Sequence, residues 1–172
     1  MSDIRLLDAQ AAERERMALA ETLADCVAGG ASLGIRWPFS VEEAHRWWGS
    51  VIESVAAGST VLFGAYVNGR LCGTVQLAFD GPCNQRHRGD VRKLLVHRDA
   101  RGQGLGNELM AALENEAVRR KLALLTLDTA TGSDAERLYE KRGYTKAGEI
   151  PNYALTPDGR PCTTSMFWKA LD

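Results

Sequence analysis

The sequence lacks the features that mark an exported or membrane-spanning chain. No apolar stretch among its 172 residues approaches the roughly 20 residues that a membrane helix needs. The N-terminus, Met1 to Arg5, is charged and lacks the apolar run of a signal peptide. The four cysteines lie far apart and form no C-x-x-C pair, so we expect reduced thiols at Cys26, Cys72, Cys83 and Cys162. These absences predict a cytoplasmic protein.

An excess of charge of one sign is also absent. The formal net charge is −1, so no overall basic field attracts nucleic acid or an acidic membrane. Cys83 and His87 have a spacing found in some metal sites, but no second ligand pair accompanies them, and we expect no metal. A covalent nucleophile is not indicated either, because Ser133 lacks a G-x-S-x-G context and no cysteine lies in an activating motif.

The composition that is present suits one ordinary globular domain over residues 1–172. Apolar residues make up 45% of the chain and charged residues 25%. Asn68-Gly69 separates two apolar runs and predicts a β-hairpin. We expect an α/β (α+β) fold, antiparallel in its first half and with a parallel crossover in its second. The expected strands are 4–7, 60–67, 71–79, 90–96, 122–129, 144–150 and 164–169, and the expected helices are 9–27, 41–57, 104–121 and 133–142.

The most informative segment is a glycine-rich turn, Arg101 to Gly106, between a predicted strand and a predicted helix. Glycines let the backbone approach a ligand closely, and the start of a helix offers unpaired N–H groups and a partial positive charge. Such a turn suits phosphate or pyrophosphate. The turn lacks the G-K-[ST] ending of a P-loop. It also lacks the third glycine of a dinucleotide fingerprint, because residue 107 is Asn107 and residue 109 is Leu109.

Two motifs resemble those of the GNAT superfamily of N-acetyltransferases. Arg101-Gly102-Gln103-Gly104-Leu105-Gly106 is similar to the loop by which that family holds the pyrophosphate of acetyl-CoA. Leu138-Tyr139-Glu140-Lys141-Arg142-Gly143-Tyr144 resembles a second family signature, in the expected order and distance. The resemblance implies a single GNAT domain, with a mixed sheet of about six or seven strands flanked by about four helices. It also implies an acetyl-CoA-dependent acyltransferase.

A narrower resemblance concerns the acceptor. Gly29 to Ser32, Leu127 to Thr129 and Thr156 to Arg160 look like stretches of the tabtoxin-resistance group within the superfamily, which acetylates an amino-acid-like toxin. This implies direct transfer to the amine of a small molecule and a role in antibiotic or toxin resistance. Acetylation of a protein or peptide amine, and a non-catalytic CoA-binding regulatory module, remain as alternatives.

The resemblance also implies roles for particular residues. The backbone of Leu94 to Val96 would pair with the pantetheine arm, and the N–H near Val96 would polarise the thioester carbonyl. Ser133 stands near the place where many family members have a pantetheine-binding asparagine. Tyr139 would protonate the departing thiolate as the general acid. The expected coenzyme-binding residues are Leu94, Leu95, Val96, Arg101, Gly102, Gln103, Gly104, Leu105, Gly106, Ser133 and Tyr139.

The general base and the acceptor pocket are less clear in the sequence. Asp90 and Asp128 are the two candidate bases, each able to take the amine's proton if burial raises its pKa. Glu149 is a candidate for binding a substrate ammonium. The sequence leaves open whether the protein is a monomer or a homodimer formed through its last strand. The candidate lining residues of the acceptor pocket are Trp47, Trp48, Asn152 and Tyr153.

Overall fold

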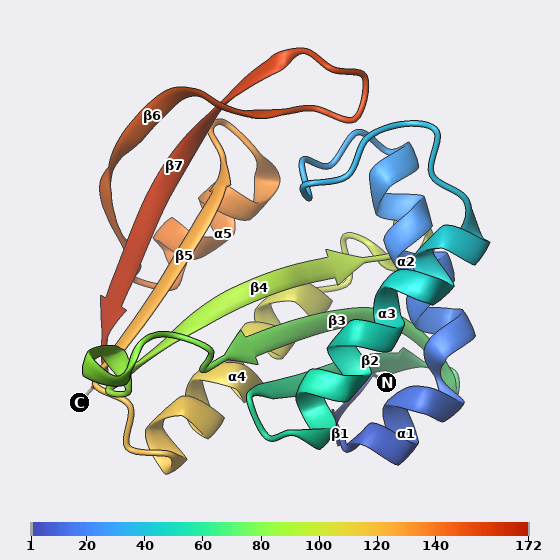
Figure 1. The fold of residues 1–172 in the computed structure, drawn as a ribbon, viewed down its shortest axis with the longest axis horizontal. Helices are drawn as coiled ribbons and strands as arrows, with labels where there is room; N and C mark the ends of the chain where they lie inside the picture. Colours follow the sequence, from blue (N-terminus) through green and yellow to red (C-terminus); the bar gives the residue numbers. More distant parts are fainter. Residues whose placement is uncertain (1, 172) are drawn as a thin grey trace.

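Seven strands form one mixed sheet in the computed structural model, which describes residues 2–171 (Figure 1). Their order across the sheet is β1-β2-β3-β4-β5-β7-β6. The strands are β1 (Ser2–Leu7), β2 (Thr60–Val67), β3 (Arg70–Ala78), β4 (Arg88–Val96), β5 (Leu124–Ala130), β6 (Thr145–Leu155) and β7 (Pro161–Ala170). The α-helices are α1 (Ala9–Arg14), α2 (Arg16–Ala28), α3 (Val41–Ala56), α4 (Leu105–Arg119) and α5 (Asp134–Lys141). The expected α/β class and number of strands are therefore confirmed.

The described residues contain five α-helices, one more than the sequence predicts. The prediction of a single helix over 9–27 is wrong. The helix is interrupted at Glu15, which is both the C-cap of α1 and the N-cap of α2. In α2, Met17 is 54% exposed, whereas Leu19 and Leu23 are fully buried. No helix among residues 2–171 is long and apolar enough to cross a membrane.

Strands β1 to β4 pair antiparallel, and helices cover both of their faces. The turn between β2 and β3 uses Asn68 and Gly69, both with positive φ, as the Asn-Gly pair predicts. Helix α3 starts at a capping box in which Ser40 and Glu43 bind each other's backbone N–H. Helices α1, α2 and α3 pack on one face around Trp48 and Leu62, and α4 packs on the opposite face. The sheet is thus the middle of three layers.

The parallel crossover joins β4 to β5 through α4, and the two strands then diverge. They pair only at three positions, Arg88 with Leu124, Gly89 with Leu125 and Asp90 with Thr126. Beyond these positions β4 continues to Val96 and β5 to Ala130 with no ladder between them. Figure 1 shows the resulting V-shaped opening in the middle of the sheet.

A β-bulge in β4 lies at Lys93, which has φ +51°. Val91 packs in the core on the α4 face, whereas Leu95 packs in the core on the α2 and α3 face. In a regular strand residues four apart share a face, so the chain must insert one extra residue between them. The bulge therefore turns Lys93 toward the face that carries α3.

A buried ion cluster ties α4 to the C-terminal strands. Glu114 of α4 accepts two hydrogen bonds from Arg142, at 3.0 and 2.8 Å, and one from Lys169 of β7 at 3.0 Å. The Glu114 side chain is only 13% exposed. Burial opposes its ionisation, but the bonds from Arg142 and Lys169 outweigh burial and lower the pKa of Glu114 below 4.5.

Replacing Glu114 by glutamine should lower the free energy of unfolding by about 3 kcal/mol at pH 7, because it leaves two partly buried cations without their carboxylate. A carboxylate whose pKa is lower in the folded state than in the unfolded state stabilises the fold at a pH above its unfolded-state pKa. This stabilisation is lost as the pH falls through the folded-state pKa. The difference in free energy of unfolding between wild type and variant should therefore shrink below about pH 4.5. Urea unfolding from pH 7 to pH 3 would measure it. Glu140→Gln, at an exposed position of α5, is the matched control and should change stability by less than about 0.5 kcal/mol.

Candidate active site

The opening between β4 and β5 exposes backbone groups that a regular sheet would pair. The N–H of His97 donates to the carbonyl of Cys72 on β3, at 2.8 Å. Backbone groups of successive residues in a strand point to alternate edges, so the N–H of Val96 faces the opening, whereas its carbonyl already accepts from Arg101 Nε at 3.0 Å. The predicted segment Leu94 to Val96 is thus placed as an unpaired strand edge that an extended ligand with amide groups could join.

Two connections that are distant in sequence meet beside this opening (Figure 1). The first is the loop 29–40 between α2 and α3, and the second is the turn between β6 and β7. The N–H of Trp37 donates to the carbonyl of Pro157 at 3.0 Å, and the hydroxyl of Ser32 donates to the carbonyl of Leu155 at 3.4 Å. These contacts place both connections at the same side of the opening.

The glycine-rich turn lies at the end of β4 and leads into α4. Gly102 and Gly104 have φ of +75° and +85°, which favour glycine, and Gly104 is the N-cap of α4. A Cβ atom added at either residue would meet no atom within 4 Å, so both face open space. The turn therefore presents a bare backbone and the start of a 15-residue helix to a ligand. This is the arrangement that pyrophosphate requires.

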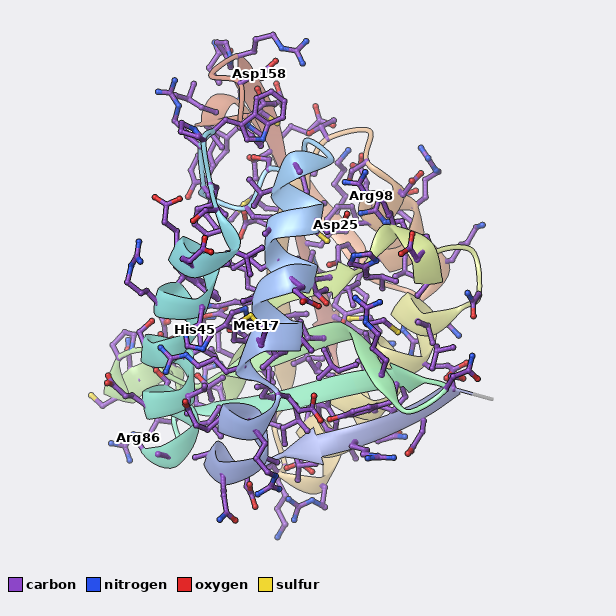
Figure 2. All side chains as sticks on the ribbon, turned by 90° about the vertical axis from the view of Figure 1, so that its right-hand side faces the viewer. Met17, Asp25, His45, Arg86, Arg98 and Asp158 are labelled. Atoms are coloured by element: carbon purple, nitrogen blue, oxygen red, sulfur yellow. The ribbon has the colours of Figure 1, made fainter. Side chains whose placement is uncertain are left out.

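Asp25 of α2 holds the arginines that precede and enter this turn. Its carboxylate accepts the backbone N–H of Arg98 at 2.9 Å and pairs with that residue's guanidinium (Figure 2). Arg101 Nη2 lies 3.7 Å from the same carboxylate, and Arg101 Nε donates to the carbonyl of Val96 at 3.0 Å. The structure thus directs the Arg101 side chain toward α2, and its predicted part in coenzyme binding stays a prediction.

His97 has a role within the turn. Its Nδ1 accepts the backbone N–H of Asp99 at 3.3 Å and so holds the short 3-10 helix Arg98–Ala100 in place. The remaining predicted turn residues, Gln103, Leu105 and Gly106, differ in burial. Leu105, the first residue of α4, is buried, Gln103 is exposed, and Gly106 lies against Leu138, whose side chain a Cβ would approach to 3.3 Å.

Tyr139 belongs to α5, the helix that follows β5. Its side chain is 5% exposed and packs against the rings of Tyr144 and Phe167, at centroid distances of 5.7 and 6.3 Å. Burial, and to a lesser degree the charge of Asp128, raises the pKa of the Tyr139 hydroxyl above its usual value. The hydroxyl is therefore protonated at neutral pH.

Ser133 caps the helix that carries Tyr139. Its hydroxyl accepts the N–H of Glu136 at 3.1 Å and lies 3.2 Å from the hydroxyl of Thr129. The structure therefore gives Ser133 a positioning role at the end of β5. The predicted contact with pantetheine stays a prediction.

The two candidate bases have different surroundings. Asp90 lies at the foot of the opening, where it accepts hydrogen bonds from Arg88 and from the hydroxyl of Thr126. Arg92 contacts its second oxygen at 3.4 Å. Asp128 lies two residues beyond Thr126 on β5, is exposed, and forms no ion pair with any residue in the range 2–171. Of the two carboxylates, Asp128 is thus the one that no described side chain engages. The sequence-based argument required a carboxylate buried in an apolar site, and neither Asp90 nor Asp128 is buried in one.

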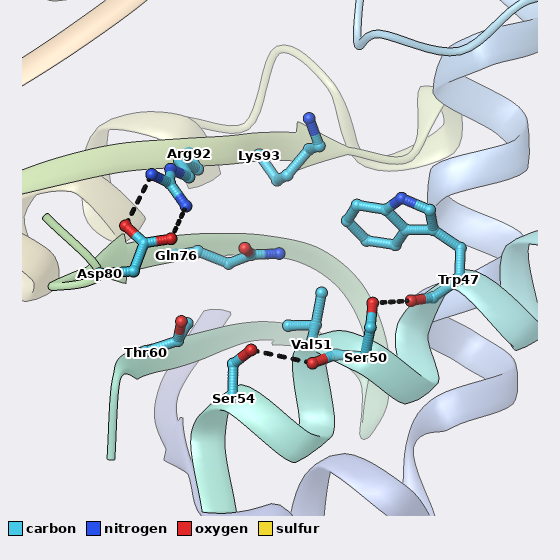
Figure 3. A pocket seen from close by; sticks show the side chains of 9 residues that line it. All are labelled: Trp47, Ser50, Val51, Ser54, Thr60, Gln76, Asp80, Arg92 and Lys93. Atoms are coloured by element: carbon cyan, nitrogen blue, oxygen red, sulfur yellow. Dashed lines mark hydrogen bonds and ion pairs between the residues drawn. The ribbon is translucent and has the colours of Figure 1, made fainter. Parts of the chain in front are cut away.

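A cavity of about 270 Å³ lies between α3 and the bulge of β4 (Figure 3). Trp47, one of the predicted pocket residues, forms a wall of it, whereas Trp48 is fully buried in the core. Asn152 and Tyr153 lie exposed on β6, and Glu149 pairs with Lys146. These three do not line the cavity. The sequence analysis missed Gln76, Arg92 and Lys93, which do. The adjacent charges Arg92 and Lys93, between the apolar residues Val91 and Leu94, were the available signal.

Among residues 2–171 no three side chains of His, Cys, Asp or Glu gather in a way that could hold a metal ion. The same residues include four free cysteines.

Comparison with known proteins agrees with this geometry. The model of the acetyltransferase (GNAT) family matches residues 31–144, so the chain belongs to that family. A relative described as an acetyltransferase, from Yersinia pestis (strain Pestoides F), is 37% identical over 81 residues, which are 46% of this chain and 54% of the relative. The chain thus spans about half the length of the curated relatives it matches.

Solved structures share the fold over nearly the whole chain. A ribosomal-protein-alanine N-acetyltransferase from Brucella melitensis has a TM-score of 0.82 at 23% identity, covering 98% of this chain and 99% of that one. A phosphinothricin acetyltransferase from Sinorhizobium meliloti, solved in complex with acetyl-CoA, has a TM-score of 0.82 at 16% identity, covering 99% and 88%. At such identities the likeness concerns the fold alone.

Proposed function

We propose that the protein transfers an acetyl group from acetyl-CoA directly to the amine of a small molecule. The observation that carries this proposal is the continuous path from the unpaired edge of β4 at Val96 to the glycine turn at the start of α4. An extended arm with two amides and a pyrophosphate at its end suits this path. Acetyl-CoA has that shape, and a related fold has been solved with it.

The side chains around the opening supply the proton transfers. Asp128 accepts the proton of the attacking amine, directly or through water. The N–H of Val96 donates to the carbonyl oxygen of the thioester as negative charge develops on it. Tyr139, whose hydroxyl remains protonated at neutral pH, donates its proton to the departing thiolate. The new amide bond forms as the C–S bond breaks, and no acyl-enzyme is required.

The acceptor is proposed to be a small molecule, with an amino-acid-like antibiotic or toxin as the leading class. The cavity beside the bulge is small, about 270 Å³, and loop 29–40 and the β6–β7 turn meet next to the opening. One fold neighbour is named for phosphinothricin, and another for the alanine of a ribosomal protein. The restricted space favours the first kind of acceptor over a folded protein. Four free thiols suit a reducing compartment such as the cytoplasm.

Thermal unfolding with acetyl-CoA, free CoA and NAD tests the coenzyme. A ligand that binds only the folded state stabilises it by about 2.7 kcal/mol at a hundredfold excess over its dissociation constant. We expect the unfolding midpoint to rise with acetyl-CoA and with CoA, and to stay unchanged with NAD. An unchanged midpoint with both coenzymes would contradict the proposal.

A glycine variant locates the coenzyme on the turn. Gly104→Ala should weaken acetyl-CoA binding at least tenfold, because the added methyl group projects into the open space where the pyrophosphate would lie. Gly58→Ala is the matched control. Gly58 has φ +73°, and its added Cβ also meets no atom within 4 Å, so both variants carry a similar backbone strain. Isothermal titration should show weaker binding only for Gly104→Ala. Equal affinities would remove the turn from the coenzyme site.

A further inference from the structure

The cavity beside the β4 bulge contains a buried hydrogen-bond donor with no acceptor. Gln76 of β3 is 5% exposed, lines the cavity, and its amide Nε2 has no partner among the described residues. In Figure 3 its amide lies below Lys93 and faces the space between β4 and α3. Buried polar groups are nearly always hydrogen-bonded, so an orphan donor aimed into a cavity indicates a missing acceptor.

A cation lies in the same cavity. Lys93 Nζ donates to the carbonyl of Leu33 at 3.0 Å, which uses one of its three donors. It forms no ion pair with any carboxylate in residues 2–171. Burial lowers the pKa of Lys93, and the charge of Asp128 opposes this shift. The indole ring of Trp47 lies 5.7 Å from the ammonium and supplies an apolar wall.

Arg92, the other cation of the cavity, is already neutralised. It forms two hydrogen bonds with Asp80, at 2.7 and 2.8 Å, and contacts Asp90 at 3.4 Å. Lys93 is therefore the cavity's cation that forms no ion pair within residues 2–171. One free cation and one free amide donor suit a singly charged planar acceptor, and two nearby carboxylates disfavour a doubly charged anion such as phosphate.

Lys93 and Asp128 present opposite charges across the opening, Lys93 from β4 and Asp128 from β5. We infer that the cavity binds a carboxylate of the acceptor through Lys93 Nζ and Gln76 Nε2, so that the acetylated amine belongs to an amino acid or a close analogue with a free carboxylate. This inference rests on the proposed function. The carboxylate at Lys93 anchors the molecule, its side chain packs on Trp47, and its amine faces Asp128 and the thioester.

Matched pairs of amines test the inference. Each of the common amino acids is assayed for acetyl transfer, by release of free thiol, beside its carboxamide and its decarboxylated amine. We expect at least one free amino acid to be acetylated with a kcat/KM at least 100-fold above that of its two partners, because a site built for a polar group rejects analogues that leave its donors unpaired.

Two variants connect this preference to the cavity. Gln76→Glu replaces the donor by a carboxylate and Lys93→Met removes the charge. Each should raise KM for the amino acid and lower kcat/KM at least 50-fold, while the values for the carboxamide change less than threefold. Lys121→Met is the matched control, because Lys121 is an exposed lysine with φ +60°, close to the φ of Lys93. It should leave all values unchanged, and acetyl-CoA titration checks that each variant is folded.

The possible failures are distinguishable. If carboxamides or decarboxylated amines are acetylated as well as the acids, or if both variants keep the preference for the acid, the carboxylate site is wrong and the acetyltransferase stands. If acetyl-CoA binds but neither acids, carboxamides nor decarboxylated amines release thiol, the proposed function fails and the inference fails with it.

Discussion

Tyr139→Phe should lower kcat by about 100-fold or more while acetyl-CoA binding and stability stay close to those of wild type. General acid catalysis by a positioned side chain contributes about 10²–10⁴ in rate, and the hydroxyl is the only group that this substitution removes. Because the ring is buried against Tyr144 and Phe167, phenylalanine keeps the packing. Steady-state kinetics with a saturating amine would measure kcat, and titration with acetyl-CoA would measure binding.

Tyr144→Phe is the control for this substitution. Tyr144 is also 5% exposed, belongs to the same core, and its ring lies 5.7 Å from that of Tyr139. It should keep kcat within about threefold of wild type. Equal losses of kcat in the two variants would mean that Tyr139 acts only through packing, and another proton donor would have to be sought at the opening.

Local features of the site could be predicted from sequence because their chemistry lies in short segments. The glycine turn depends on φ values that only glycine adopts readily, and Gly102 and Gly104 have them. The hairpin at Asn68-Gly69 is local in the same sense. The general class of fold followed from the order of such segments.

Features that depend on long-range packing could not be predicted. The bulge at Lys93 is visible only when the neighbours of Val91 and Leu95 are known, since they lie in different cores. Two partners of Arg101, Asp25 and Cys26, lie on α2, more than 70 residues away in sequence. The orphan amide of Gln76 is a property of the assembled cavity. The acceptor pocket was therefore the part that sequence described least well, whereas the coenzyme site is built mainly from one segment.

The position of the base is the other prediction with a large expected effect. Asp128→Asn should lower kcat by about 10²–10⁴, because the bound amine must then lose its proton to solvent. For the same reason the variant's kcat should rise more steeply with pH than that of wild type. Asparagine keeps the shape of the exposed side chain, so the fold should be unaffected. A pH profile of kcat from 6 to 9 would measure both effects.

Asp90→Asn separates this role from a positioning one. Asp90 accepts hydrogen bonds from Arg88, Arg92 and Thr126 at the last paired position of β4 and β5. Loss of its carboxylate should therefore loosen the foot of the opening and lower the free energy of unfolding. Its pH profile should keep the shape of the wild-type profile, since the proton acceptor is still present. If Asp90→Asn changed the slope and Asp128→Asn did not, the base would be Asp90 and the amine would enter from the foot of the opening.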